Sequence, residues 1–164
     1  MWINHYRQIT IRGDQHQTLF RNNIAETLNL ALPRSVGKST QNNDGRLMCL
    51  GPDEWLYVGF NADNKTYGHL WQMKSALIKQ DITTAIVDVS NARSVLKFNG
   101  VSTILNGFCP LNFDESAFPI ACVAQSHLGH AGVIFYRLDS MTFELHVLNS
   151  MTDYIDHLLS EIMR

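Results

Sequence analysis

The spacing of apolar residues changes repeatedly between a period of two and a period near 3.6 over the first half of the chain. Residues 6–12 alternate and predict a strand, and Asp14 is the expected N-cap of a helix that continues to about residue 30. The buried stripe of that helix is predicted to contain Leu19, Phe20, Ile24 and Leu28. The polar stretch at 33–45 then predicts a loop.

Two short apolar runs follow at 47–50 and 55–60, and the turn residues Gly51-Pro52-Asp53 between them predict a hairpin. Helical spacing returns over 64–80, where Trp71 is expected to face the core. β-Branched residues at 82–89 predict another strand. The predicted order of strand, helix, strand, strand, helix and strand is that of the ferredoxin-like split βαβ fold.

The second half of the chain repeats this alternation in pattern. Residues 93–98 predict a strand and 101–108 a short helix, and three more strands are predicted near 118–126, 132–138 and 142–148. The last helix has the clearest apolar stripe, formed by Tyr154, Ile155, Leu158, Leu159 and Ile162. We therefore predict an α+β fold in one domain over 1–164, with two interlocked ferredoxin-like α+β modules at about 1–90 and 91–164.

Composition and charge narrow the classes of function. The formal net charge of −2 predicts no general attraction to nucleic acid or to an anionic membrane. No apolar run approaches the roughly 20 residues of a membrane span, and the first residues lack the features of a secretory signal. Three widely spaced cysteines are an odd set for a disulfide framework. We expect a soluble cytoplasmic protein with reduced thiols.

Two motifs that could carry chemistry fail their own requirements. Gly37-Lys38-Ser39-Thr40 resembles the end of a phosphate-binding loop, but Leu32 stands where that loop needs its first glycine. A zinc site usually contains a closely spaced cysteine pair, which is missing from the set Cys109, Cys122, His127 and His130. We assign no catalytic, cofactor-binding or metal-ligating residue in this chain.

A polar cluster at 88–93 separates the two halves. Its short side chains are expected to hold the junction by hydrogen bonds, with Arg93 pairing Asp88, and the alternative is a contact to a partner chain or ligand. Exposed Trp and Arg side chains are favoured at protein interfaces, and Trp55 is expected at a hairpin base. The residues predicted to contact a partner are Trp55, Arg93 and Phe118.

Several segments carry a resemblance to a known family. They are Leu50-Gly51-Pro52-Asp53-Glu54-Trp55-Leu56, Asp88-Val89-Ser90-Asn91-Ala92-Arg93-Ser94-Val95-Leu96, Gly107-Phe108-Cys109-Pro110-Leu111, Phe118-Pro119, Ala124-Gln125 and Phe143-Glu144-Leu145. In this combination and order the chain resembles the gamma subunit of heterotetrameric sarcosine oxidase. That family is similar in fold to the folate-binding domain of glycine-cleavage aminomethyltransferases, which implies two interlocked α+β modules.

The resemblance implies a structural, non-catalytic subunit of a complex that oxidatively demethylates sarcosine. The products would be glycine, hydrogen peroxide and either formaldehyde or methylene-tetrahydrofolate. The implied partners are the alpha, beta and delta subunits, which would hold FAD, FMN, NAD and zinc and use tetrahydrofolate. The Gly-Glu pair of folate-binding relatives is missing from residues 138–144, which argues against folate binding here.

Two alternatives stay open at this stage. Fold similarity alone also allows a stand-alone folate-binding, aminomethyltransferase-like protein or a folate-binding RNA-modification factor. A regulatory or binding module with another partner is the third hypothesis. An isolated subunit would expose apolar interface patches, so self-association is expected when the chain is alone.

Overall fold

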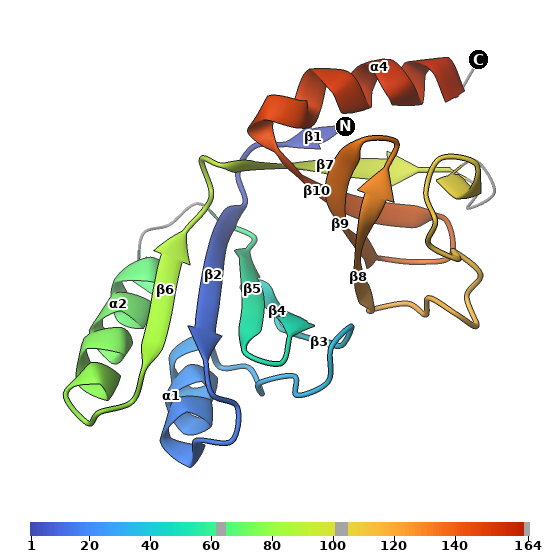
Figure 1. Cartoon of the computed structure of the whole chain (residues 1–164). Helices are drawn as coiled ribbons and strands as arrows, with labels where there is room; N and C mark the ends of the chain where they lie inside the picture. The colour runs from blue at the N-terminus through green and yellow to red at the C-terminus, as the bar shows by residue number, and fades with distance from the viewer. Residues whose placement is uncertain (62–64, 101–104, 163–164) are drawn as a thin grey trace. The chain divides into compact units, whose positions relative to one another are not determined.

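The computed structural model describes residues 1–61, 65–100 and 105–162 (Figure 1). The chain divides into two compact units. One contains His5–Ser90, and the other contains Asn91–Arg164 together with Met1–Asn4. We call them the N-terminal and C-terminal units. Each has one five-stranded antiparallel sheet and helices, so the predicted α+β class is confirmed. Whether the two form a single domain stays a prediction.

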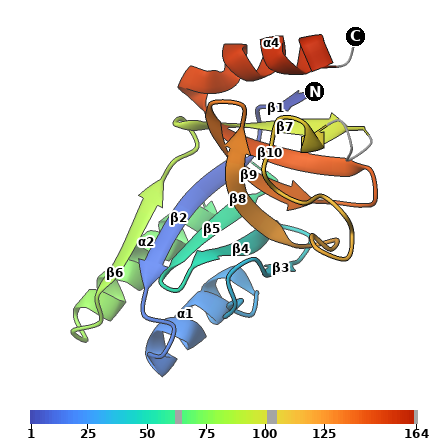
Figure 2. The ribbon, with the colours of Figure 1, turned by 45° about the vertical axis from the view of Figure 1, so that its right-hand side comes forward.

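The N-terminal unit follows the predicted ferredoxin-like order with one additional strand. Its elements are β2 (Arg7–Gly13), α1 (Thr18–Leu28), β3 (Ser39–Gln41), β4 (Gly45–Gly51), β5 (Glu54–Gly59), α2 (Lys65–Ile78) and β6 (Thr84–Asp88). The strands lie in the order β3-β4-β5-β2-β6. Helices α1 and α2 cover one face of this sheet (Figure 1 and Figure 2).

The apolar side chains of the N-terminal unit gather between its sheet and its helices. Strands β2, β4 and β5 turn every second side chain toward the helices, as the period of two requires. The resulting core contains Ile9, Ile11, Phe20, Ile24, Leu47, Cys49, Trp55, Tyr57, Leu70, Met73 and Leu77. Burial of this continuous apolar cluster is the main source of stability for the unit.

The C-terminal unit is built from β7 (Arg93–Asn99), β8 (Val123–Leu128), β9 (Ala131–Arg137), β10 (Thr142–Leu148), the short 3₁₀ turn η1 (Asn149–Met151) and α4 (Thr152–Ile162). Its sheet is completed by β1 (Trp2–Ile3), and the strand order is β8-β9-β10-β7-β1. The predicted helix over 101–108 lies partly outside the described residues, and Leu105 belongs to the core of this unit.

The two sheets share one topology. In the order β3-β4-β5-β2-β6 the strand that follows the second helix, β6, lies at the edge beside the first strand. In the C-terminal unit β1 takes that place beside β7, although it comes from the other end of the chain. The indole N–H of Trp2 donates to the Asp156 carboxylate on α4 at 2.9 and 3.0 Å. One strand of the C-terminal sheet therefore comes from the N-terminal end of the chain, and this is the sense in which the modules are interlocked.

Helix α1 corrects two details of the sequence prediction. It begins at Thr18 with Gln17 as N-cap, not at Asp14, because the Asp14 carboxylate accepts a hydrogen bond from the His16 N–H (2.8 Å) and closes a turn before the helix. Leu19 was placed in the buried stripe, yet its side chain is 48 % exposed. The buried residues Phe20, Ile24 and Leu28 are spaced by four, so Leu19 lies beside the buried face and the apolar stripe is narrower than predicted.

Trp71 on α2 was predicted to face the core and is instead 48 % exposed. The buried face of α2 consists of Leu70, Met73 and Leu77, whose spacing of three and four leaves the neighbouring position outside. The ammonium group of Lys74 lies 4.5 Å from the Trp71 ring centre. A cation–π contact with solvent access therefore replaces core packing at this position.

The buried tryptophan of the hairpin should matter for stability. The indole N–H of Trp55 donates to the Pro33 carbonyl at 2.8 Å, and the ring packs 5.6 Å from Phe20. Trp55→Phe should lower the free energy of unfolding by about 2–3 kcal/mol, because it leaves a buried carbonyl unpaired and a small cavity. The matched control Trp71→Phe, at an exposed ring, should change stability by less than about 1 kcal/mol. Urea denaturation measures both changes. If the two variants lose the same free energy of unfolding, the buried indole of Trp55 has no special role in stability.

Candidate functional site

The structure places the three predicted contact residues in different settings. Trp55 on β5 has no exposed surface, and Phe118 is only 3 % exposed. Phe118 packs against Phe113 and Phe143 in an aromatic cluster, with ring centres 6.1 and 6.4 Å apart. Arg93, at the start of β7, is partly exposed. Contact with a partner stays a prediction for all three, and only Arg93 has appreciable accessible surface with which to make it.

The Gly51-Pro52-Asp53-Glu54-Trp55 segment forms the tight connection between β4 and β5. The Asp53 carboxylate lies 2.8 Å from the guanidinium of Arg12, and the Asp53 carbonyl accepts a hydrogen bond from the Gly13 N–H at 3.1 Å. The hydrogen bond to Asp53 raises the pKa of Arg12, and the charges of Asp53 and Glu54 add to the effect. The segment therefore anchors the hairpin to the end of β2.

The polar cluster after β6 holds the end of that strand, as its short side chains predicted. The Ser90 hydroxyl accepts a hydrogen bond from the Gln8 N–H at 2.9 Å and donates to the Asp88 carboxylate at 2.6 Å. Asp88 also forms an ion pair with Arg7 at 2.7 Å. Arg93 was expected to be the partner of Asp88, and that pair stays a prediction, whereas the ion pair of Asp88 with Arg7 is present.

A buried arginine organises the loop that precedes β8. The side chain of Arg137 donates hydrogen bonds of 2.9 to 3.1 Å to four backbone carbonyls, those of Phe113, Phe118, Asp139 and Ser140. Its guanidinium carbon also lies 5.3 Å from the Phe143 ring centre. These contacts explain why Phe118 lies in this loop, before β8, and not in the strand predicted over 118–126.

The residues that matched the folate-binding stretch serve local structure. The Asp139 carboxylate accepts hydrogen bonds from the Met141 and Thr142 N–H groups, both at 2.8 Å, and the bond from Met141 is the main reason that the pKa of Asp139 is lowered. Glu144 and His146 lie two residues apart on one face of β10, both buried, with 3.9 Å between the His146 Nε2 and a Glu144 carboxylate oxygen. Glu144 and His146 therefore form a buried polar pair on one face of the C-terminal sheet.

All three cysteines lie in buried surroundings. Cys49, Cys109 and Cys122 are free thiols, all buried, and burial raises the pKa of Cys49. A high thiol pKa lowers the thiolate fraction and so the nucleophilicity of this side chain. Among residues 1–61, 65–100 and 105–162, the structure contains no group of three or more His, Cys, Asp or Glu side chains that could hold a metal ion. The same residues contain no helix with the length and hydropathy of a membrane span.

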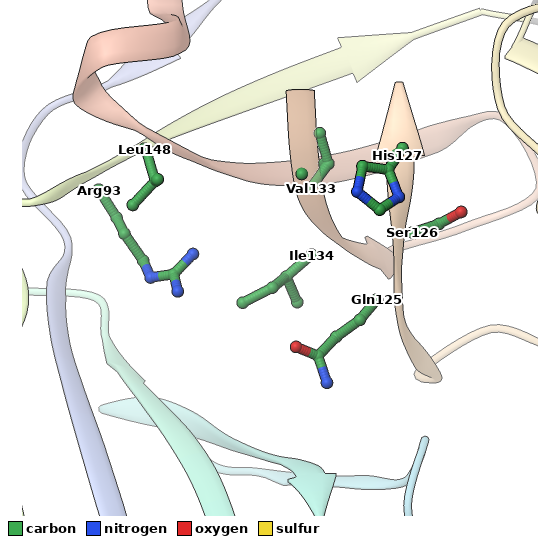
Figure 3. Close-up of a pocket in the computed structure, with 8 residues that line it drawn as sticks. Arg93, Gln125, Ser126, His127, Val133, Ile134 and Leu148 are labelled. Atoms are coloured by element: carbon green, nitrogen blue, oxygen red, sulfur yellow. The ribbon is translucent and has the colours of Figure 1, made fainter. Parts of the chain in front are cut away.

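One cavity of the C-terminal unit is lined by Arg93. Strand register builds it: Arg93 pairs with Leu148 across β7 and β10, and Gln125 and His127 pair with Ile134 and Gly132 across β8 and β9. The cavity has a volume of about 450 Å³ and is also lined by Ser126 and Val133. Figure 3 shows the side chains of Arg93, Gln125 and Ile134 directed into the same space. We call this cavity the Arg93 groove.

Gly132 gives the groove part of its depth. A Cβ atom built at Gly132 would meet no other atom within 4 Å, and this glycine is not in the left-handed backbone region. Sequence reasoning identified Arg93 and the Ala124-Gln125 pair but not Gly132, Ile134 or Leu148. Alternation along β8, β9 and β10 could have shown which residues share a face, but not the register that brings four strands together.

The fold and these contacts define a class of protein: a pair of ferredoxin-like α+β units whose distinctive segments stabilise the fold. The sequence profile of the sarcosine oxidase, gamma subunit family matches residues 12–163, so this chain belongs to the sarcosine oxidase gamma subunit family. The resemblance found in the sequence is thereby confirmed. No curated protein matches the sequence.

Solved structures agree on the fold. Heterotetrameric sarcosine oxidase from Corynebacterium sp. U-96, in complex with pyrrole 2-carboxylate, contains a chain that is 21 % identical over 99 % of this chain and 81 % of its own length, with a TM-score of 0.87. The glycine cleavage system aminomethyltransferase T from Bartonella henselae matches 96 % of this chain at 13 % identity and a TM-score of 0.62. This chain covers 44 % of that aminomethyltransferase, which is less than half of its length.

Arg137 should be essential to the C-terminal unit. Arg137→Met keeps much of the side-chain volume but removes the hydrogen bonds to four carbonyls, so the free energy of unfolding should fall by about 3 kcal/mol or more. Chymotryptic cleavage after Phe113, in the loop at 112–122, should become faster, because the loop loses its anchor. The control Arg12→Met, which breaks an exposed ion pair, should have a clearly smaller effect. An Arg137 variant as stable as the wild type would exclude this role.

Proposed function

We propose that this chain is the gamma subunit of a heterotetrameric sarcosine oxidase and that it stabilises the complex without contributing a catalytic group. The observation that carries the proposal is the family match over residues 12–163, which spans nearly the whole chain. A fold shared with a chain of the Corynebacterium enzyme over 99 % of the length supports it. A fold alone does not assign a function, so the family match carries the greater weight.

The contacts of the family-like segments support a structural role. Asp53 binds Arg12, Trp55 binds the Pro33 carbonyl, and Asp88 binds Arg7 and Ser90. Each of these bonds joins two parts of the same unit. The segments that identify the family are therefore used to hold the chain in its shape.

In this proposal the partners are the alpha, beta and delta subunits of a cytoplasmic complex. Those subunits would hold FAD, FMN, NAD and zinc and would use tetrahydrofolate, and their reaction would be the oxidative demethylation of sarcosine to glycine. This chain would contribute a folded surface for docking. A cofactor that carries the chemistry needs a protein that positions it, and a neighbouring subunit can supply part of that rigidity.

The second candidate is a stand-alone folate-binding, aminomethyltransferase-like protein. The shared fold with aminomethyltransferase T is the observation in its favour. Against it, Asp139 is engaged in its own turn by the backbone N–H groups of Met141 and Thr142. Calorimetry with tetrahydrofolate and the isolated chain separates the two candidates, and tight stoichiometric binding would favour the second.

Assembly of the complex provides the direct test. Co-expression of a tagged form of this chain with alpha, beta and delta subunits should yield one complex that contains all four chains in equal amounts and turns over sarcosine. Omission of this chain should lower the yield of active complex by about tenfold or more, because the other subunits lose a partner that stabilises them in the folded state.

The isolated chain is the control for catalysis. Purified alone, it should show no flavin absorbance and no sarcosine-dependent production of peroxide. A stable and fully active oxidase that assembles without this chain would overturn the structural role. Flavin bound tightly to the isolated chain would overturn its non-catalytic assignment.

A further inference from the structure

We propose that one side of helix α2 is a docking site for an amphipathic helix of a partner subunit, one that carries an aspartate or glutamate beside its apolar stripe. We call this side the outer flank of α2, and it consists of Tyr67, Trp71, Lys74 and Ile78. The inference rests on the proposed function and adds the place and the chemistry of one subunit contact. Exposed apolar surface, helical spacing and local charge are the observations that carry it.

The outer flank exposes large apolar side chains that the core of the unit does not use. Trp71 is 48 % exposed and Ile78 is 50 % exposed, and the two lie seven residues apart, on the same side of the helix. The Tyr67 ring is only partly buried, and its centre lies 6.3 Å from that of Trp71. A tryptophan in such a row is the residue type most often found at the centre of a protein interface.

The spacing of the outer flank suits a second helix. Its four residues follow one another at intervals of four, three and four, so they form a straight row about 16 Å long. Rows with this spacing are the seams along which two helices pack. His69, Gln72 and Ala76 lie on the other side of α2, where they line a shallow groove together with residues of α1. A partner helix can therefore contact the outer flank without displacing α1.

Helix α2 presents this row on a firm support. Its buried residues Leu70, Met73 and Leu77 pack into the core of the N-terminal unit, whose sheet lies beneath the helix (Figure 1). The guanidinium carbon of Arg7 on β2 lies 5.6 Å from the Tyr67 ring centre and holds the first turn of the helix. A surface that is already ordered costs less entropy on binding, which favours a specific contact.

The charge of α2 selects an acidic partner. The helix contains Lys65 and Lys74 and no aspartate or glutamate, and Lys79 follows it directly, although the formal net charge of the whole chain is −2. The Lys74 ammonium lies 4.5 Å from the Trp71 ring centre, so a cation belongs to the apolar row itself. A carboxylate beside the apolar stripe of a partner would therefore meet Lys74 when that stripe meets Trp71.

A helix of another subunit suits these features better than a second copy of this chain. Two outer flanks packed together would bring lysines of both copies close to one another, and like charges oppose such a contact. Helix α4 of this chain has three acidic residues, but its apolar residues Ile155 and Leu159 are buried in the C-terminal unit. It therefore has no apolar stripe to offer to the outer flank of another copy.

A membrane surface is the other class of partner that apolar and cationic side chains can bind. Helices that lie on membranes insert a broad apolar face between the lipids. The broad apolar face of α2, with Leu70, Met73 and Leu77, is already buried in its own unit. The narrow row that remains exposed matches the seam of a helix pair better than it matches a lipid surface.

The test is a competition between wild type and variant for places in the complex. Both forms, with different tags, are co-expressed with the alpha, beta and delta subunits, and the ratio of the tags in the purified complex is compared with that among unassembled chains. Trp71→Ala should enter the complex about tenfold less than the wild type, the size expected when an interface tryptophan is truncated. Ile78→Ala should have a smaller effect in the same direction. The matched control Gln72→Ala, on the α1 side of the same helix, should stay within about twofold.

A second pair of variants tests the charge. Lys74→Glu should lower incorporation by about tenfold or more, because it places a like charge opposite the partner's carboxylate. The control Gln72→Glu also introduces a carboxylate into α2, but on the side that faces α1, and should stay within about twofold. All of these side chains are exposed or partly exposed, so each isolated variant should melt within a few degrees of the wild type.

The outcomes separate this inference from the proposed function. If the wild type enters the complex and Trp71→Ala and Lys74→Glu compete equally well, the docking site is excluded and the subunit role stands. If the wild type does not enter the complex, both proposals fail. Self-association of the isolated chain, or its binding to vesicles of phosphatidylcholine and phosphatidylserine, would overturn the docking site if either depends on Trp71 while incorporation of the variants is unchanged.

Discussion

The pairing of β1 with β7 is the constraint on which the C-terminal unit depends. In the N-terminal unit the position beside the first strand is taken by β6, which follows the second helix, and in the C-terminal unit the matching position beside β7 is taken by β1. The N-terminal strand fills it, with Trp2 opposite Leu96 and Ile3 opposite Val95. The amino terminus and the backbone N–H of Lys97 add hydrogen bonds across this edge. An uncovered β7 would present an unpaired edge beside apolar side chains, which favours aggregation.

The pairing of β1 with β7 also brings together residues that lie far apart in the sequence, which affects the order of folding. Residues 1–4 contact a strand and a helix that follow them by more than ninety positions, as the Trp2–Asp156 hydrogen bonds show. Contacts at this separation in sequence form late, because closing a long loop costs entropy before the contact stabilises anything. The N-terminal unit has mostly shorter connections between paired strands. We infer that it folds first and that β1 docks onto β7 in a later step.

Short-range pattern was sufficient to predict most of the elements. The hairpin at Gly51-Pro52-Asp53 and the amphipathic helix that contains Ile155 and Leu159 depend on neighbouring residues, so turn chemistry and periodicity identified them. Strands β1 and β3 escaped prediction because two or three residues are too few to show alternation. Trp71 was misplaced since amphipathic period alone does not fix which edge of a stripe is covered.

The Arg93 groove was beyond sequence reasoning for a different reason. Arg93, Gln125 and Gly132 come from three strands, and their proximity depends on register. A shift of one residue in any pair would turn the side chains to the other face. That register is fixed at a distance: Arg137 closes the loop before β8, and the aromatic cluster around Phe113 orients the core face of the same strands.

The two faces of the C-terminal sheet therefore carry different sets of side chains. Every second residue of β9 and β10, such as Phe135 and Leu145, packs into the core with α4, while Ile134 and Leu148 are left to the other face. Core residues and groove residues alternate along β9 and β10. A shift of one set along the strand would therefore also shift the other set. The arrangement of the side chains that line the Arg93 groove is therefore only as rigid as the core on the other face of the sheet.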